Sequence, residues 1–182
     1  MKRLLAIGLL IVSMGCSFCP RRQADLVYLR LEPDVSEVKS LPAYCLWQVD
    51  ASQALRERRM VYKKGVFYHK YASHFWYSPP PRMLEEALLD AFSFACSCDN
   101  AKRLYVHLED LEPIFGKNGN YLFFRVRVFV YGRHHEKLAE HTFSYQSPLK
   151  GIDFEKIKLG FDRLVSKFIS DLYGWLSKGF AD

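Results

Sequence analysis

The sequence lacks the short motifs that mark the common enzyme classes. It contains no G-x-S-x-G, no phosphate-binding glycine loop, no H-E-x-x-H and no dinucleotide-binding glycine pattern. Its six histidines are scattered, and no cysteine or histidine pairs stand at the spacing of a zinc site. We therefore predict a protein that is not an enzyme, with no catalytic residue, no metal and no cofactor.

The chain also lacks a dense run of positive charge. Its formal net charge is +6, and the basic residues are spread, with the densest patches at residues 56–64 and at Arg125 and Arg127. Nucleic-acid binding usually needs a more concentrated basic stripe, so we expect no nucleic-acid partner. The simplest interpretation is a solvated basic surface, which could face anionic lipid headgroups.

No apolar run is long enough to cross a bilayer, which takes roughly 20 residues. Residues 1–15 instead have the order of a secretory signal, with two basic residues, nine apolar residues (4–12) and a glycine directly before Cys16. A cysteine at this place predicts lipid attachment at Cys16, as in bacterial lipoproteins, where several acyl chains anchor a protein stably. The alternative is an ordinary signal cut elsewhere, with Cys16 an incidental thiol.

The compartment and the domain organisation follow from this signal. Ser17 after the lipidated cysteine is permissive for outer-membrane sorting, so we expect an envelope protein facing the periplasm, with the outer membrane favoured over the inner. Residues 16–24 are a polar tether, and residues 25–182 are long enough for one domain with a proper core.

The apolar spacing after residue 25 predicts an α/β (α+β) fold. Two periodic segments predict helices, one starting at the prolines of residues 78–81 and ending near residues 96–100, the other over 153–176. The expected strands are 25–31, 43–49, 59–63, 66–71, 103–115, 121–131 and 137–145. Together they predict a two-layer sandwich, a mixed, largely antiparallel sheet with both helices on one face. The uncovered face would be free for solvent, lipid or a partner.

We expect two groups of polar residues in this region to be exposed to solvent. The acidic residues Glu109, Asp110 and Glu112 stand at a strand end, where we expect them to be solvated. His134 and His135 fall in a predicted turn, where solvation is also expected.

Four cysteines follow Cys16, and exported proteins can form disulfides. Two interpretations stay open: a structural bridge between Cys45 and either Cys96 or Cys98, or free buried thiols. Redox catalysis at the C-x-C pair is disfavoured, since no thioredoxin-like βαβ pattern surrounds it.

The least ordinary stretch is the aromatic segment of residues 74–80. One interpretation is that its aromatic rings fill the base of the following helix. The other is an exposed surface for an acyl chain or a protein partner, because exposed apolar patches and clustered Trp and Tyr mark binding sites. The residues of this candidate partner-binding or lipid-binding surface are Phe75, Trp76, Tyr77, Pro79 and Pro80.

The same region resembles a known family. The residues that carry the resemblance are Arg58-Arg59-Met60-Val61-Tyr62, Phe67-Tyr68, Tyr71, Trp76, Pro79-Pro80, Leu84, Leu88 and Leu89. They are similar to the auxiliary lipoproteins of ABC-type transport systems, paraquat-inducible-type lipoproteins that accompany Mce-domain proteins. The resemblance covers roughly residues 28–176.

The resemblance implies a non-catalytic role in moving phospholipid or other hydrophobic molecules between the envelope membranes. The expected partners are an Mce-domain protein, the permease and ATPase of an ABC transporter, phospholipid, and further copies of the chain. The alternative is a scaffold or activator lipoprotein of another envelope machine, such as one for secretion or cell-wall synthesis.

Overall fold

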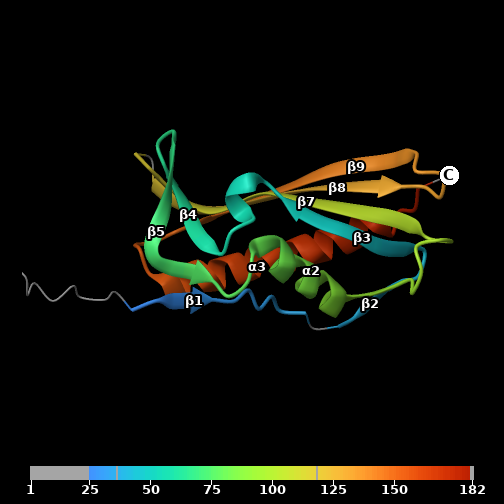
Figure 1. Ribbon diagram of the computed structural model, residues 1–182, viewed down its shortest axis with the longest axis horizontal. Helices are drawn as coiled ribbons and strands as arrows, with labels where there is room; N and C mark the ends of the chain where they lie inside the picture. The colour runs from blue at the N-terminus through green and yellow to red at the C-terminus, as the bar shows by residue number, and fades with distance from the viewer. Residues whose placement is uncertain (1–24, 36, 118, 181–182) are drawn as a thin grey trace, which may run out of the picture.

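The computed structural model describes residues 25–35, 37–117 and 119–180 (Figure 1). The predicted signal peptide, the lipidation site at Cys16 and the tether of residues 16–24 lie outside the described residues. Among the described residues, no helix has the length and apolarity that crossing a membrane requires.

The described chain alternates strands with two long helices. The strands are β1 (Val27–Leu29), β2 (Lys39–Leu41), β3 (Tyr44–Ala51), β4 (Arg59–Lys64), β5 (Phe67–Trp76), β6 (Phe92–Phe94), β7 (Lys102–Gly116), β8 (Gly119–Tyr131) and β9 (Lys137–Pro148). The helices are α2 (Pro80–Ala91) and α3 (Phe154–Leu176), with a short 3-10 turn, η2 (Gln53–Leu55).

The main sheet is mixed, and both helices pack on it, which confirms the predicted fold class. Its strand order is β1-β5-β4-β7-β8-β9, and β3 also pairs with β7. The pairs β4–β5, β7–β8 and β8–β9 are antiparallel, whereas β1–β5, β3–β7 and β4–β7 are parallel. In Figure 1, β5 curves around the helix layer, so that β1 lies across the helices from β7, β8 and β9.

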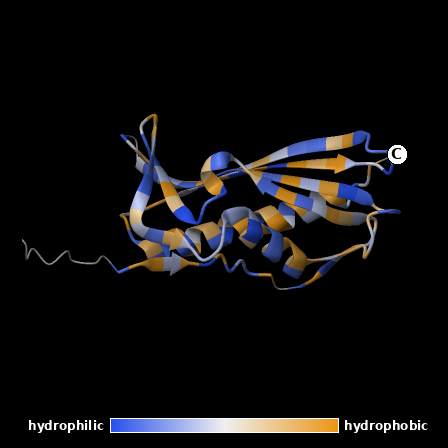
Figure 2. Cartoon of the chain, in the orientation of Figure 1, coloured by the Kyte–Doolittle hydropathy of each residue, from blue (hydrophilic) through white to orange (hydrophobic). Residues whose placement is uncertain are grey.

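The core lies between α3 and the sheet. Along β8 every second side chain is buried, and the alternation of apolar and polar residues along the long strands is visible in Figure 2. On α3, Phe161, Val165, Phe168 and Leu172 are fully buried. The ring of Phe168 packs 5.7 Å from that of Phe124 on β8, so the helix and the sheet interlock through aromatic rings.

Helix α2 ends earlier than the expected boundary near residues 96–100. Its start agrees with the prediction, since prolines occupy its first positions. At Phe92 the chain becomes extended because β6 pairs in parallel with β2. β2 lies between the expected strands 25–31 and 43–49, where no strand was predicted. The pairing joins segments far apart in sequence, so no local pattern predicts it.

Of the two interpretations of the cysteines, the structure has the bridge, between Cys45 and Cys98. The two Cα atoms lie 5.3 Å apart, and the bridge joins residues separated by 53 positions. It ties the start of β3 to the loop between β6 and β7. Cys96 is the other member of the C-x-C pair, and its thiol is free and exposed rather than buried.

We expect the bridge to stabilise the fold, since a cross-link over a loop of this length restricts the unfolded chain. In a Cys96→Ser background, which prevents a replacement bridge, Cys98→Ser should lower the free energy of unfolding by about 2 to 5 kcal/mol. Urea unfolding under non-reducing conditions measures this. Cys96→Ser alone is the control and should unfold like the parent; equal stability of both variants would show that the bridge is not structural.

Candidate functional site

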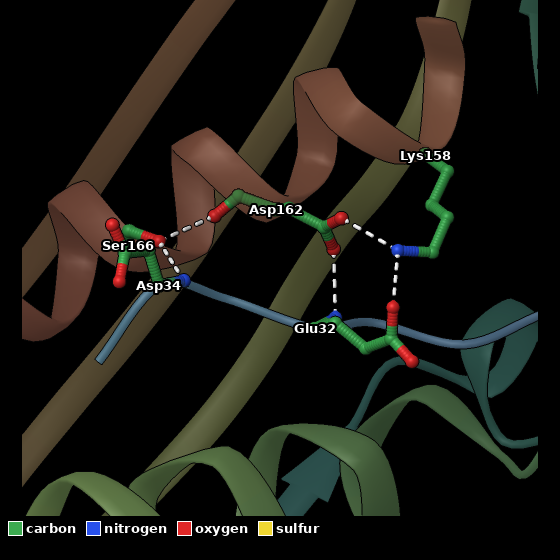
Figure 3. Close-up of polar contacts among 5 residues, drawn as sticks. All are labelled: Glu32, Asp34, Lys158, Asp162 and Ser166. Atoms are coloured by element: carbon green, nitrogen blue, oxygen red, sulfur yellow. Dashed lines mark hydrogen bonds and ion pairs between the residues drawn. The ribbon is translucent and has the colours of Figure 1, made fainter. Parts of the chain in front are cut away.

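The segment that follows β1 is clamped to helix α3 (Figure 3). The backbone N–H of Glu32 donates to Asp162 Oδ1 at 2.8 Å, and the N–H of Asp34 donates to Ser166 Oγ at 2.9 Å. The ammonium of Lys158 contacts both Glu32 Oε2 at 2.8 Å and Asp162 Oδ2 at 2.9 Å. β1 is only three residues long, and its pairing with β5 alone would hold it weakly, so these contacts help to keep it in place.

The aromatic segment at the end of β5 is held between β1 and the turn before β4. The N–H of Trp76 donates to the carbonyl of Arg58 at 2.6 Å, and the N–H of Tyr77 donates to the carbonyl of Leu29 at 2.7 Å. The indole of Trp76 is 1% exposed and packs 5.8 Å from the ring of Phe161 on α3. Trp76 is therefore the anchor that fixes its exposed neighbours.

Around this anchor, arginines and aromatic rings form a continuous surface. Arg58 lies 5.2 Å from the ring centroid of Tyr28, and Arg59 lies 5.3 Å from that of Phe75. A hollow of about 430 Å³ opens there, lined by Tyr28, Glu57, Arg58, Arg59, Lys70 and Phe75. Next to it, Arg30 lies 5.6 Å from the ring of Tyr77. We call this the basic–aromatic surface: Tyr28, Arg30, Arg58, Arg59, Phe75 and Tyr77.

The basic–aromatic surface is positive because few of its charges are neutralised. Lys70 pairs with Glu57 at 2.7 Å, and Arg30 reaches Glu86 only at 4.0 Å. Within the described part of the chain, neither Arg58 nor Arg59 forms an ion pair. Guanidinium groups held over aromatic rings are suited to carboxylates and phosphates on a partner, and such residues are enriched in interfaces.

The predicted partner-binding residues divide between this surface and the core. Tyr77 is 58% exposed and Phe75 is half-buried, so both are accessible. Trp76 and Pro80 are buried, and a partner cannot reach them. Pro79 is partly buried at the start of α2.

Sequence reasoning missed two contributors to this surface. Tyr28 lies beside Phe75 only because β1 pairs with β5 in parallel, in a register that places these two residues opposite each other. Arg30 follows on the same segment. The sequence signals for the site were the aromatic segment of residues 74–80 and the Arg58-Arg59 pair, which formed part of the family resemblance.

The acidic residues of β7 are not solvated, so that expectation is wrong. Asp110 is 8% exposed and Glu112 2% exposed. Arg125 on β8 contacts Asp110 at 2.6 Å and Glu109 at 2.9 Å, and Arg127 contacts Glu109 at 2.6 Å. The antiparallel register pairs Asp110 with Arg125, so the charges compensate one another across the two strands.

The buried carboxyl group of Glu112 has a raised pKa. Burial raises its pKa to about 7, and the nearby Asp110 carboxylate adds to the rise, while Lys63, Tyr68 and Arg125 oppose it. A carboxyl group with a pKa near neutrality can act as an acid or base. The 2% exposure of Glu112 keeps a substrate away from it, and this argues for a structural role.

The predicted turn histidines lie where β8 passes into β9. Both are exposed, and His135 adopts a φ of 65°. His135 stacks edge-on against Trp47 and contacts the guanidinium of Arg103. In the described ranges, no three His, Cys, Asp or Glu side chains are grouped closely enough to hold a metal ion.

Comparisons with known proteins show the fold alone. No family model and no curated protein matches this chain. A crystal structure of a Xanthomonas campestris protein, described under the family model DUF330, aligns with a TM-score of 0.67 at 14% identity, covering 84% of this chain and 94% of that one. A second crystal structure, described only as an uncharacterized protein, aligns at 0.61 and 13% identity, covering 81% and 96%.

A Neisseria meningitidis lipoprotein aligns with a TM-score of 0.27 at 11% identity, covering 57% of this chain and 77% of its own. That value is too low to carry an argument. The first two likenesses show that the arrangement of strands and helices is shared with proteins of very different sequence.

The raised pKa of Glu112 predicts a change of stability with pH. Because the folded state favours the protonated form, this stabilisation is fully present below the ordinary pKa of 4.5 and is lost as the pH rises through about 7. The parent should lose up to about 3 kcal/mol of unfolding free energy over this range relative to Glu112→Gln. Urea unfolding from pH 4 to 8 measures the difference, and parallel curves for the two proteins would contradict it.

Proposed function

We propose that this chain is a membrane-anchored accessory lipoprotein that faces the periplasm and serves an Mce-domain and ABC-type transport system. It would help move phospholipid or other hydrophobic molecules between the envelope membranes by binding partners, without catalysis. The observation that carries the proposal is the basic–aromatic surface, which lies beside the first described residues of the chain.

The position of this surface suits a partner close to a membrane. Tyr28 follows Cys16 by only 12 residues. An extended chain rises at most about 3.5 Å per residue, so lipidation at Cys16 would keep the surface within about 40 Å of the bilayer. A partner at the same membrane would lie within that reach.

The chemistry of the surface also suits a protein partner. Tyr77 projects from a rigid base, because its neighbour Trp76 is buried and its own N–H is bonded to β1. Rigid aromatic rings and arginines carry most of the binding energy in many interfaces. A partner that fits would present carboxylates to Arg58 and Arg59 and an apolar contact to Tyr77.

The lipid anchor is tested by the mature protein itself. Mass spectrometry of the chain purified from bacterial membranes should find Cys16 as the first residue, carrying acyl groups. Cys16→Ala should leave a chain that is not acylated and no longer sediments with membranes. A mature N-terminus at another position, or an unmodified Cys16, would exclude the anchor.

The partner is tested by photocrosslinking in intact membranes. A photoreactive phenylalanine analogue in place of Tyr77 should capture an Mce-domain protein or a transporter subunit. Capture should fall about thirtyfold when Arg58→Ala and Arg59→Ala are added, the effect of losing about 1 kcal/mol at each of two interface arginines. The control places the analogue at Trp47, which is also exposed but lies beside His135 in the turn between β8 and β9. Capture of only secretion or cell-wall components would favour the alternative scaffold role.

A further inference from the structure

The hairpin formed by β4 and β5 ends in an exposed apolar tip (Figure 1). Lys64 pairs with Phe67, which leaves Gly65 and Val66 as a two-residue loop. Gly65 has a φ of +62°, a left-handed conformation that glycine adopts without strain in such tight turns. This turn places Val66 at the apex, 79% exposed, beside Phe67, which is 68% exposed.

A second hairpin tip lies against the first. Lys64 on β4 pairs in parallel with Phe115 on β7, just before β7 turns into β8. The two tips border an open hollow of about 720 Å³, which we call the tip hollow. It is lined by Lys64, Gly65, Val66, Phe67, Phe115, Gly116, Lys117 and Asn120.

Lysines surround these apolar side chains. Lys64 and Lys117 are exposed and form no ion pair within the residues that the structure describes. Lys63 lies 5.4 Å from the ring of Tyr68, which is itself 54% exposed. Exposed apolar residues surrounded by lysines are typical of protein surfaces that lie in the headgroup region of a membrane. There the apolar atoms enter the acyl boundary and the ammonium groups contact phosphates.

The location of the tip hollow agrees with such a contact. In Figure 1 both hairpin tips lie at the same end of the long axis as β1, whereas the turn between β8 and β9 lies at the other end. The nine residues of 16–24 can span about 30 Å when extended. A membrane that holds Cys16 is therefore within reach of the tip.

We propose that the residues lining the tip hollow insert into the headgroup region of an anionic phospholipid bilayer. This bilayer is the membrane to which the chain is anchored. The inference rests on the proposed lipid anchor and adds a second contact to it. Two contacts would restrict how the domain stands on the membrane, with the β4–β5 hairpin facing the lipid and the basic–aromatic surface beside it. A protein partner or a second copy of the chain in the tip hollow is the competing outcome.

The test follows the depth of Phe67 in a bilayer. Phe67→Trp, in the mature lipid-modified chain, is placed in vesicles of phosphatidylcholine with about a quarter phosphatidylglycerol. Lipids with brominated acyl chains quench tryptophan that reaches the acyl boundary. The matched control is Leu89→Trp, since Leu89 is also apolar and 54% exposed but lies on α2. The native tryptophans set the background, measured on the unsubstituted chain.

We expect bromine quenching above background for Phe67→Trp and none for Leu89→Trp. Adding Val66→Asp should abolish it, and adding Lys64→Gln or Lys117→Gln should each shift the ratio of inserted to free tips about fivefold, as expected for one basic residue near an anionic surface. Because all five substituted positions are exposed, these variants should fold like the parent, and circular dichroism checks this.

Quenching of Phe67→Trp that stays at background, while the chain remains with the vesicles, would overturn the tip insertion and leave the transport role standing. Shielding of the Phe67→Trp position from aqueous quenchers in an unacylated chain of residues 17–182, free of lipid and detergent, would also overturn it, because a protein surface would then cover the tip. A chain that does not stay with the vesicles at all would reject the lipid anchor, on which both proposals depend.

Discussion

The contact between the apolar face of α3 and β8 is the interaction on which the rest of the structure depends. The helix approaches the strand so closely that a Cβ on Gly160 would lie 2.2 Å from Leu122 Cδ1, so a larger residue there would make the Leu122 side chain shift. The same helix then turns its polar side to the N-terminal segment, where Asp162 accepts from Glu32 and pairs with Lys158. One helix therefore closes the core and holds β1.

Holding β1 in this way has a consequence for function. β1 is only three residues long, yet it supplies Tyr28 to the basic–aromatic surface and joins the domain to the segment that leads to Cys16. A force on a lipid anchor at Cys16 would be transmitted through β1 to the contacts that Glu32 and Asp34 make with α3. The β4–β5 hairpin extends from this rigid base, and it carries Arg59 at one end and the tip hollow at the other.

The long strands and α3 were predictable because their periodicity is local. On β8 and α3 the buried residues recur at intervals of two and of three to four, and the observed boundaries lie close to the expected ones. β2 and β6 were missed since each is three residues long and is defined only by pairing with the other. The bridge of Cys45 was predictable as a choice between two partners, and only the fold selects Cys98.

The candidate site was less predictable than the fold. The aromatic segment attracted attention by composition, but burial separates Trp76 from Tyr77, and a sequence does not show which of two adjacent rings faces the core. The burial of Asp110 and Glu112 was missed for a related reason. The charge of Asp110 is compensated across the sheet by Arg125, a pairing set by the β7–β8 register and its irregularity near Asp110. Glu112 lies opposite Phe123 and is buried with a raised pKa instead.

We propose that this chain is a lipoprotein that supports lipid movement between two membranes by holding a partner. The most direct measurement is the rate at which isotopically labelled phospholipid passes between the inner and outer membranes of cells that lack this chain. We expect slower transfer, restored by the parent protein but not by a variant whose basic–aromatic surface has lost Arg58 and Arg59. Transfer at the parental rate in the cells that lack the chain would contradict it.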